Sequence, residues 1–235
     1  MKNKVLTLGL FATILIISAF VYVQRTQTNV MTKAMQQNIL PEQALQKLKD
    51  GNERFVNGKE INHNRKQEVA QTANGQYPYA VILSCIDSRV SSEIIFDQNL
   101  GDVFNARIAG NIVNTDILGS MEFACKVAGA KLIVVVGHTK CGAIKGACDH
   151  VELGNLTHLV KEISPAVDSV KNISGERNSK NDAFVKAIAL KNIDLTIKEI
   201  RLKSTTIKEL EDNGKVKIVG ALYDVSTGKV NFSLN

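Results

Sequence analysis

The stretch KLIVVVGHTKCGA, residues 131–143, gives the clearest indication of the fold. Its first half is a short run of apolar, mostly β-branched residues without polar alternation, which is typical of a strand buried on both faces of a parallel sheet. Its second half places His138 and Cys141, spaced H-x-x-C, directly after that strand. Ligands of open α/β sheets gather at the carboxyl ends of the strands, so this turn is predicted to belong to a functional site.

A second turn of the same kind lies upstream, in YAVILSCIDSRV, residues 79–90. An apolar run of strand length ends there in Cys85, and Asp87 and Arg89 follow at alternate positions. Two cysteine-bearing turns at equivalent places in the chain indicate one shared site.

The rest of the chain alternates between strand and helix patterns. A strand is expected over 102–109 and a C-terminal hairpin over 215–234. Helices are expected over 91–98, over 115–130 with Thr115 or Asp116 as cap, and over 181–203. Strands separated by helices predict βαβ units with right-handed crossovers, and therefore an α/β fold with a mostly parallel sheet flanked by helices.

The N-terminal part has a different character. Residues 1–28 contain two lysines, the uncharged run Val5–Val23 and then Arg25, which is typical of an export signal or an uncleaved membrane anchor. This segment predicts a domain outside the cytoplasm, periplasmic or on the outer face of the cytoplasmic membrane. The polar residues 29–40 are interpreted as a linker and 41–235 as the folded domain, opening with a helix at Pro41. Residues 57–76 are expected to form an extended arm.

Composition excludes several classes of function. The chain has 235 residues, 44% hydrophobic and 22% charged, as in a globular protein. Its net charge of +6 falls to +3 without residues 1–28, which is too weak and scattered for nucleic-acid binding. Four cysteines are too few for a disulfide scaffold, so the thiols of an exported chain must be buried, paired or bound to metal.

The two turns together favour a metal centre. Cys85, His138 and Cys141 offer two thiolates and one imidazole, and three protein ligands with one open position is the catalytic zinc arrangement. A lone cysteine at a strand end is ordinarily a small buried hydrophobe, but two such clusters favour one Zn²⁺ per chain. A closed structural site would need a fourth ligand, for which Cys148 is the nearby candidate. The C-x5-R loop of phosphatases and the P-loop pattern are both absent.

Asp87 and Arg89 then acquire two alternative roles. Asp87 can occupy the fourth metal position and cap the ion, or it can accept a bidentate pair from Arg89 and leave that position free for water. Backbone N–H groups at the helix start near Gly142 are expected to stabilise thiolate and product charge.

These residues resemble the β-class carbonic anhydrases through CIDSRV, GDVFNARIAGN and GHTKCGA, over roughly residues 40–225. The resemblance implies a four-stranded parallel core with an added antiparallel strand, and dimers or tetramers whose N-terminal helices embrace the partner. It implies a zinc lyase that interconverts CO₂ and bicarbonate, with Cys85, His138 and Cys141 as ligands and Asp87 and Arg89 as the catalytic dyad.

The same resemblance places Gln76 and Phe104 against the substrate. Ile82 stands where the bicarbonate-inhibited subgroup has tryptophan, which favours the plant-like subgroup with open zinc. Phe123 stands where that subgroup often has tyrosine, so one hydrogen bond is lost.

The alternatives are a CS₂ or COS hydrolase of the same fold and a non-catalytic exported zinc-binding protein. His63, His150 and His158 are interpreted as surface or cap residues, Cys125 as core, and Cys148 as core or free.

Overall fold

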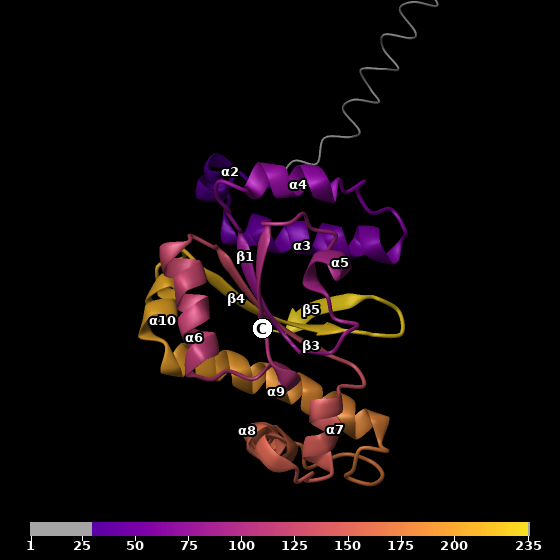
Figure 1. Ribbon diagram of the computed structural model, residues 1–235. Coiled ribbons are helices and arrows are strands. Elements are labelled where there is room, and N and C mark those ends of the chain that lie inside the picture. Colours follow the sequence, from indigo (N-terminus) through magenta and orange to yellow (C-terminus); the bar gives the residue numbers. More distant parts are fainter. Residues whose placement is uncertain (1–29, 235) are drawn as a thin grey trace, which may run out of the picture.

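The computed structural model describes residues 30–234, so the predicted export segment 1–28 lies outside the described residues. Its centre is a five-stranded sheet in the order β2-β1-β3-β4-β5 (Figure 1). The strands are β1 (Ala80–Ser84), β2 (Val103–Arg107), β3 (Leu132–His138), β4 (Lys217–Tyr223) and β5 (Val230–Leu234). The first four are parallel and β5 is antiparallel to β4, which confirms the predicted fold class.

The strand register brings the two cysteine-bearing turns to one edge of the sheet. Ser84, the last residue of β1, lies opposite Val136 of β3 and Arg107 of β2. Cys85 therefore leaves the sheet close to where His138 ends β3. All seven residues of β3 are buried, as expected for a central parallel strand.

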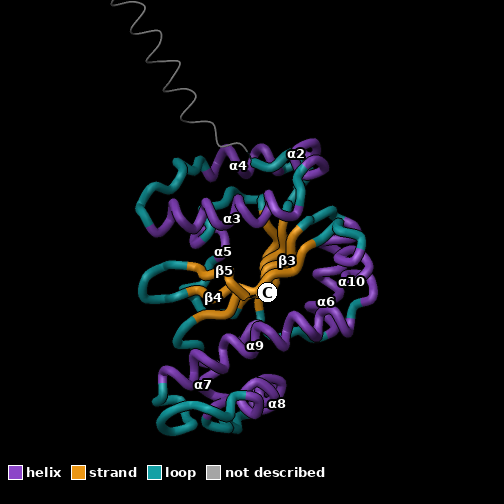
Figure 2. The backbone as a smooth tube through the Cα atoms, turned by 180° about the vertical axis from the view of Figure 1, so that it is seen from behind, coloured by secondary structure: helices purple, strands orange, loops and turns teal. Residues whose placement is uncertain are grey.

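Helices cover both faces of the sheet (Figures 1 and 2). One face, which includes Ile82 and Val134, packs against Ala44 and Leu48 of the N-terminal helices. The other face packs against the helices that follow β2. The helices are α2 (Lys33–Asn38), α3 (Pro41–Val56), α4 (Arg65–Thr72), α5 (Ser92–Ile95), α6 (Thr115–Glu122), α7 (Gly142–Cys148), α8 (Gly154–Ser169), α9 (Asp182–Lys203) and α10 (Thr205–Asp212). No helix among residues 30–234 is long and apolar enough to span a bilayer.

The prediction of a linker over 29–40 is wrong for the described part of that segment. Residues 33–38 form α2, capped by the Thr32 hydroxyl. The buried Gln36 side chain donates to the carbonyls of Pro78 and Ala128, and the Met31 N–H donates to Asp102. This segment therefore belongs to the domain, because hydrogen bonds between side chains and backbone groups attach it to the body.

Two further elements differ from the sequence-based expectation. The arm over 57–76 contains α4, which the Asn64 side chain caps. The helix expected over 115–130 is capped by Asn114 rather than Thr115 or Asp116, and after Glu122 it continues as a π-helical turn, η2 (Phe123–Val127). The wider turn ends at Gly129, whose φ of 87° suits glycine.

Candidate metal centre

The three predicted ligands converge at the carboxyl edge of the sheet. Cys85 follows β1, His138 ends β3, and Cys141 is the N-cap of α7. Their donor atoms lie within 4.8 Å of one another, and the two sulfurs are 3.9 Å apart. All three side chains are buried. One metal ion can therefore reach all three donors.

The imidazole of His138 is held in a tautomer that can bind a cation through Nε2. Its Nδ1 lies 3.0 Å from the carbonyl oxygen of Thr139, which can only accept, so Nδ1 carries the proton. Its Nε2 then has a free lone pair. This atom is buried and has no hydrogen-bond partner among residues 30–234. A buried acceptor without a partner is costly, and a metal ion at this place removes the cost.

The two thiol groups contact each other. The contact with the Cys141 sulfur, together with backbone N–H groups of Gly110 and Asp87, lowers the pKa of Cys85 well below its usual value, although burial acts against it. The same contact and burial raise the pKa of Cys141. Backbone N–H groups of Ala143 and Ile144 point to the Cys141 sulfur. Two thiolates and one neutral imidazole match the donor set that Zn²⁺ prefers, so these residues fit zinc.

Asp87 pairs with Arg89 beside this cluster. Its Oδ1 accepts from Arg89 Nε at 2.9 Å and its Oδ2 from Nη2 at 2.8 Å. The pair holds the pKa of Asp87 well below its usual range. The Oδ2 atom remains 3.9 Å from Nε2 of His138, next to the ligands without replacing one.

Two residues that hold the Cys85 turn were not found from the sequence. Arg107, at the end of β2, donates from Nε to the Cys85 carbonyl at 3.0 Å and from Nη2 to the Asp87 carbonyl at 2.8 Å. The Gly110 N–H points to the Cys85 sulfur at 3.5 Å. The fragment GDVFNARIAGN contains both, but nothing in its spacing shows which groups face the ligand turn.

The predicted substrate-facing residues lie apart from the metal cluster in the single chain. Gln76 is exposed and precedes the start of β1, at the opposite end from Cys85. Phe104 pairs in register with Val81, and its ring centroid lies 6.3 Å from that of Phe123. These two rings line a hollow of about 580 Å³ that contains none of the three ligands. Gly142, by contrast, is exposed at the start of α7, beside Cys141.

Of the other candidates, His63 is not a simple surface residue. Its Nε2 lies 2.7 Å from Asp97, and its Nδ1 lies 3.3 Å from Glu68. Both carboxylates are buried, so His63 links the segment before α4 to the body. His150 and His158 are exposed, as expected. Cys125 and Cys148 are buried in the core, and burial raises the pKa of both.

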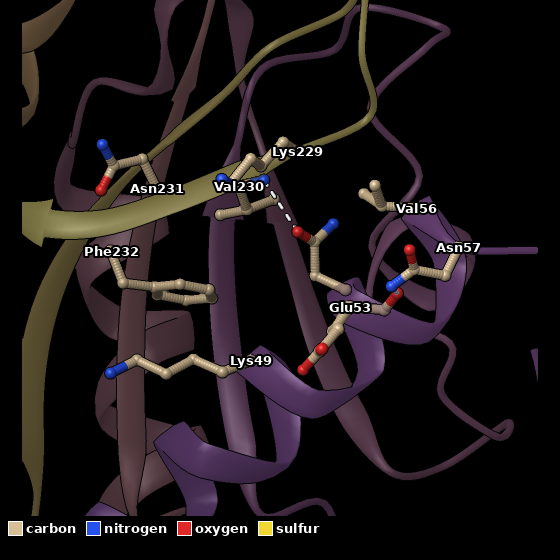
Figure 3. Close-up of a pocket in the computed structure, with 9 residues that line it drawn as sticks. Lys49, Glu53, Val56, Asn57, Lys229, Val230, Asn231 and Phe232 are labelled. Atoms are coloured by element: carbon tan, nitrogen blue, oxygen red, sulfur yellow. Dashed lines mark hydrogen bonds between the residues drawn. The ribbon is translucent and has the colours of Figure 1, made fainter. Parts of the chain in front are cut away.

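A hollow of about 720 Å³ lies between α3 and β5, where Lys49, Glu53 and Phe232 face one another (Figure 3). Asn52 bridges its two walls, since its side chain donates to the Gly228 carbonyl and accepts from the Val230 N–H. None of the predicted metal ligands lines this hollow.

The sheet and the buried Cys–His–Cys cluster at its carboxyl edge together define an α/β protein with a candidate metal centre. A family model described as carbonic anhydrase matches residues 80–230. Carbonic anhydrase 2 of Mycobacterium tuberculosis is 37% identical over 200 residues, which cover 82% of this chain and 92% of that protein. The carbonic anhydrase of Mycolicibacterium smegmatis is 35% identical over 199 residues, covering 82% and 93%.

Solved structures of β-carbonic anhydrases have the same fold as this chain. A Coccomyxa β-carbonic anhydrase in complex with acetazolamide has a TM-score of 0.64 at 22% identity, covering 72% of this chain and 78% of that chain. One of two tetrameric β-carbonic anhydrases from Sordaria macrospora has a TM-score of 0.60 at 25% identity, covering 72% and 90%. The chain therefore belongs to the β-class carbonic anhydrase family, and its enzyme class is that of the carbonate dehydratases, which are zinc lyases.

Proposed function

We propose that this protein catalyses the zinc-dependent, reversible hydration of CO₂ to bicarbonate and a proton. The observation that carries the proposal is the buried convergence of Cys85, His138 and Cys141 within 4.8 Å, with the Asp87–Arg89 pair beside them. Zn²⁺ held by these three side chains supplies a Lewis acid that lowers the pKa of a water molecule.

The chain's own groups orient that chemistry. Arg89 keeps Asp87 ionised and fixed, so its Oδ2 can accept a hydrogen bond from water next to the ligands. The Gly110 N–H and the first N–H groups of α7 offset thiolate charge. The released proton passes to buffer.

The pairing of Asp87 with Arg89 supports an active site whose fourth metal position is open. Ile82 supports the same assignment, because no tryptophan is present in the chain. We assign the protein on these grounds to the plant-like, open-zinc subgroup.

Gln76 and Phe104 face substrate, in our proposal, within a homodimer or homotetramer. In one chain β1 separates them from the ligands, so a second copy has to supply them. The tetrameric Sordaria macrospora relative supports an assembled state. The uncharged run Val5–Val23 supports export, with residues 1–28 as signal or anchor.

Stopped-flow CO₂ hydration combined with zinc analysis tests the proposed reaction. The wild type should carry about one zinc per chain and hydrate CO₂. Asp87→Ala should retain zinc and lose activity by about 100-fold, since a positioned acid–base group contributes on that order. Asp212→Ala, which removes an exposed α10 ion pair, is the control and should behave as wild type. A zinc-loaded wild type without hydration at any pH would instead support the non-catalytic alternative.

A further inference from the structure

Two polar side chains lie on the buried side of α9, among isoleucines. Asn192 is 3% exposed and Thr196 is 4% exposed, and Ile193 and Ile197 next to them are buried as well. Residues four apart in a helix lie on the same face, so the two polar groups form one site. Burying an amide and a hydroxyl in an apolar core is unfavourable unless both are hydrogen-bonded.

Both groups bind consecutive carbonyls of the same short turn, η1 (Ala109–Asn111). The Asn192 Nδ2 donates to the Gly110 carbonyl at 2.8 Å, and the Thr196 hydroxyl donates to the Asn111 carbonyl at 3.4 Å. This turn has left-handed backbone at two successive residues, with φ of 73° at Gly110 and 45° at Asn111. Asparagine adopts this conformation more readily than most other residues with a side chain, and the two α9 side chains hold the carbonyls of both residues from outside the turn.

The same turn supplies a hydrogen bond to a predicted metal ligand. The Gly110 N–H points to the Cys85 sulfur at 3.5 Å. The helix also reaches the strand of a second ligand, because a Cβ atom on Gly137 would lie 2.7 Å from the Ile193 side chain. Asn192 thus contacts Gly110, whose N–H points to Cys85, and Ile193 packs against Gly137, which precedes His138 in the chain.

We propose that Asn192 is a positioning residue of the metal centre. By holding the Gly110 carbonyl it fixes the η1 turn, and through that turn it aims the Gly110 N–H at the Cys85 thiolate. Thr196 assists by holding the next carbonyl. Asn192 does not touch the metal or the substrate. The inference deepens the proposed function, since it rests on the same zinc site.

Asn192→Leu in the full-length protein tests this role, because leucine keeps the branching and the number of heavy atoms of the side chain and removes the donor. Loss of a partner behind a ligand typically lowers metal affinity by about 10- to 100-fold, and we expect a loss of zinc affinity in this range by competition with a chelator. In the Co²⁺-substituted protein the thiolate-to-metal charge-transfer band should also shift, since the hydrogen bond to sulfur changes its donor strength.

Asn52→Leu is the matched control. Asn52 of α3 is also a buried helix asparagine that donates to backbone carbonyls, those of Ile95 and Gly228, but it contacts no ligand turn. This variant should lower the melting temperature and leave zinc affinity and the Co²⁺ spectrum unchanged. Comparable destabilisation of both variants, with unchanged zinc affinity in each, would overturn the inference.

If Asn192→Leu does not fold, Thr196→Val tests whether α9 positions the metal centre through the η1 turn. It removes one neutral hydrogen bond in a nearly isosteric way and should weaken zinc binding by about threefold to tenfold. Zinc affinity equal to wild type would overturn the inference there. Failure of the wild type to bind zinc would overturn the proposed function itself, so the two failures are distinguishable.

Discussion

At the candidate metal centre, the contacts of a single residue can leave one of its donor atoms available for an ion. His138 uses Nδ1 on the Thr139 carbonyl and leaves Nε2 buried without a partner among the described residues. The convergence of Cys85, His138 and Cys141 could be predicted from the sequence because each lies at, or within three residues after, the carboxyl end of a strand. Arg107 and Asn192 could not, because they reach the site through contacts across the fold. No spacing in the chain records that Asn192 binds the Gly110 carbonyl, 82 positions away.

Arg89→Ala and Arg89→Lys together test whether the bidentate geometry of the Asp87–Arg89 pair matters beyond its charge. The alanine variant should retain zinc, since Arg89 is no ligand, and lose about 10- to 100-fold in CO₂ hydration because Asp87 is no longer held. Arg89→Lys should recover activity only in part, since an ammonium cannot form the two parallel bonds of the guanidinium. Stopped-flow rates at equal zinc content measure the effect. Full activity in both variants would contradict the role of the pair.

Strands and helices were predicted well where apolar runs define them. They were predicted poorly where polar contacts hold them in place. The strands of the parallel core follow directly from apolar, β-branched runs. Polar composition made α2 and α4 look like linker and loop. Gln36 and Glu68 are nevertheless buried, because each is matched by backbone or charged partners on a distant segment. A pattern that treats polar residues as exposed cannot detect such helices.

Gly51→Ala tests the packing of α3 on the segment after α5. A Cβ atom at Gly51 would lie 1.8 Å from the Phe96 carbonyl oxygen, so the backbone must move apart. We expect a loss of about 1–3 kcal/mol in the free energy of unfolding. Gly119→Ala on α6 is the control: nothing lies within 4 Å of its added Cβ, so it should be neutral or slightly stabilising. Chemical denaturation measures both, and equal values would contradict the predicted clash.

Glu68→Gln tests the charges that hold α4. Burial alone raises the pKa of Glu68, but the Leu100 N–H and Arg65 outweigh it and hold that pKa below its usual value. The contribution of Glu68 is therefore full above the unfolded-state pKa and is lost as the pH falls through the lower folded-state pKa. At pH 7 the variant should melt about 5 °C lower than wild type.

The difference between Glu68→Gln and wild type should shrink as the pH falls below about 4. Glu42→Gln, at an exposed pair with Lys217, should change the melting temperature little at any pH. A difference for Glu68→Gln that stays constant down to pH 3 would contradict the assigned role of its charge.

Across the whole molecule, the ligands and the proposed substrate-facing residues lie at opposite ends of β1. Five strand residues span roughly 15 Å, more than any side chain can bridge. The sequence resemblance implied that Gln76 and Phe104 belong to the same site as Cys85, but only the register shows that one chain cannot join them. The proposed active site is therefore complete only in an oligomer.

Subunit mixing tests this arrangement. Cys85→Ser should abolish zinc binding and Gln76→Ala should reduce CO₂ hydration, each in its own homo-oligomer. In mixed oligomers one site combines a zinc-binding subunit with an intact Gln76 from the other, so activity should rise above that of either parent. A mixture of Cys85→Ser and Cys141→Ser is the control. It should show no gain in activity, because neither subunit holds zinc. No rise in the first mixture would contradict a contribution from a second copy.

The position of β3 between β1 and β4 also sets an order in time. All three predicted ligands have been synthesised once the chain reaches residue 141, but Asn192 follows 51 residues later and β4, at 217–223, later still. Until then the Gly110 carbonyl lacks its donor, and one edge of the strand that ends in His138 has no neighbour. A nascent chain therefore contains the side chains predicted to bind metal well before it contains Asn192 and β4, which hold them in place. The metal centre can be completed only late in synthesis.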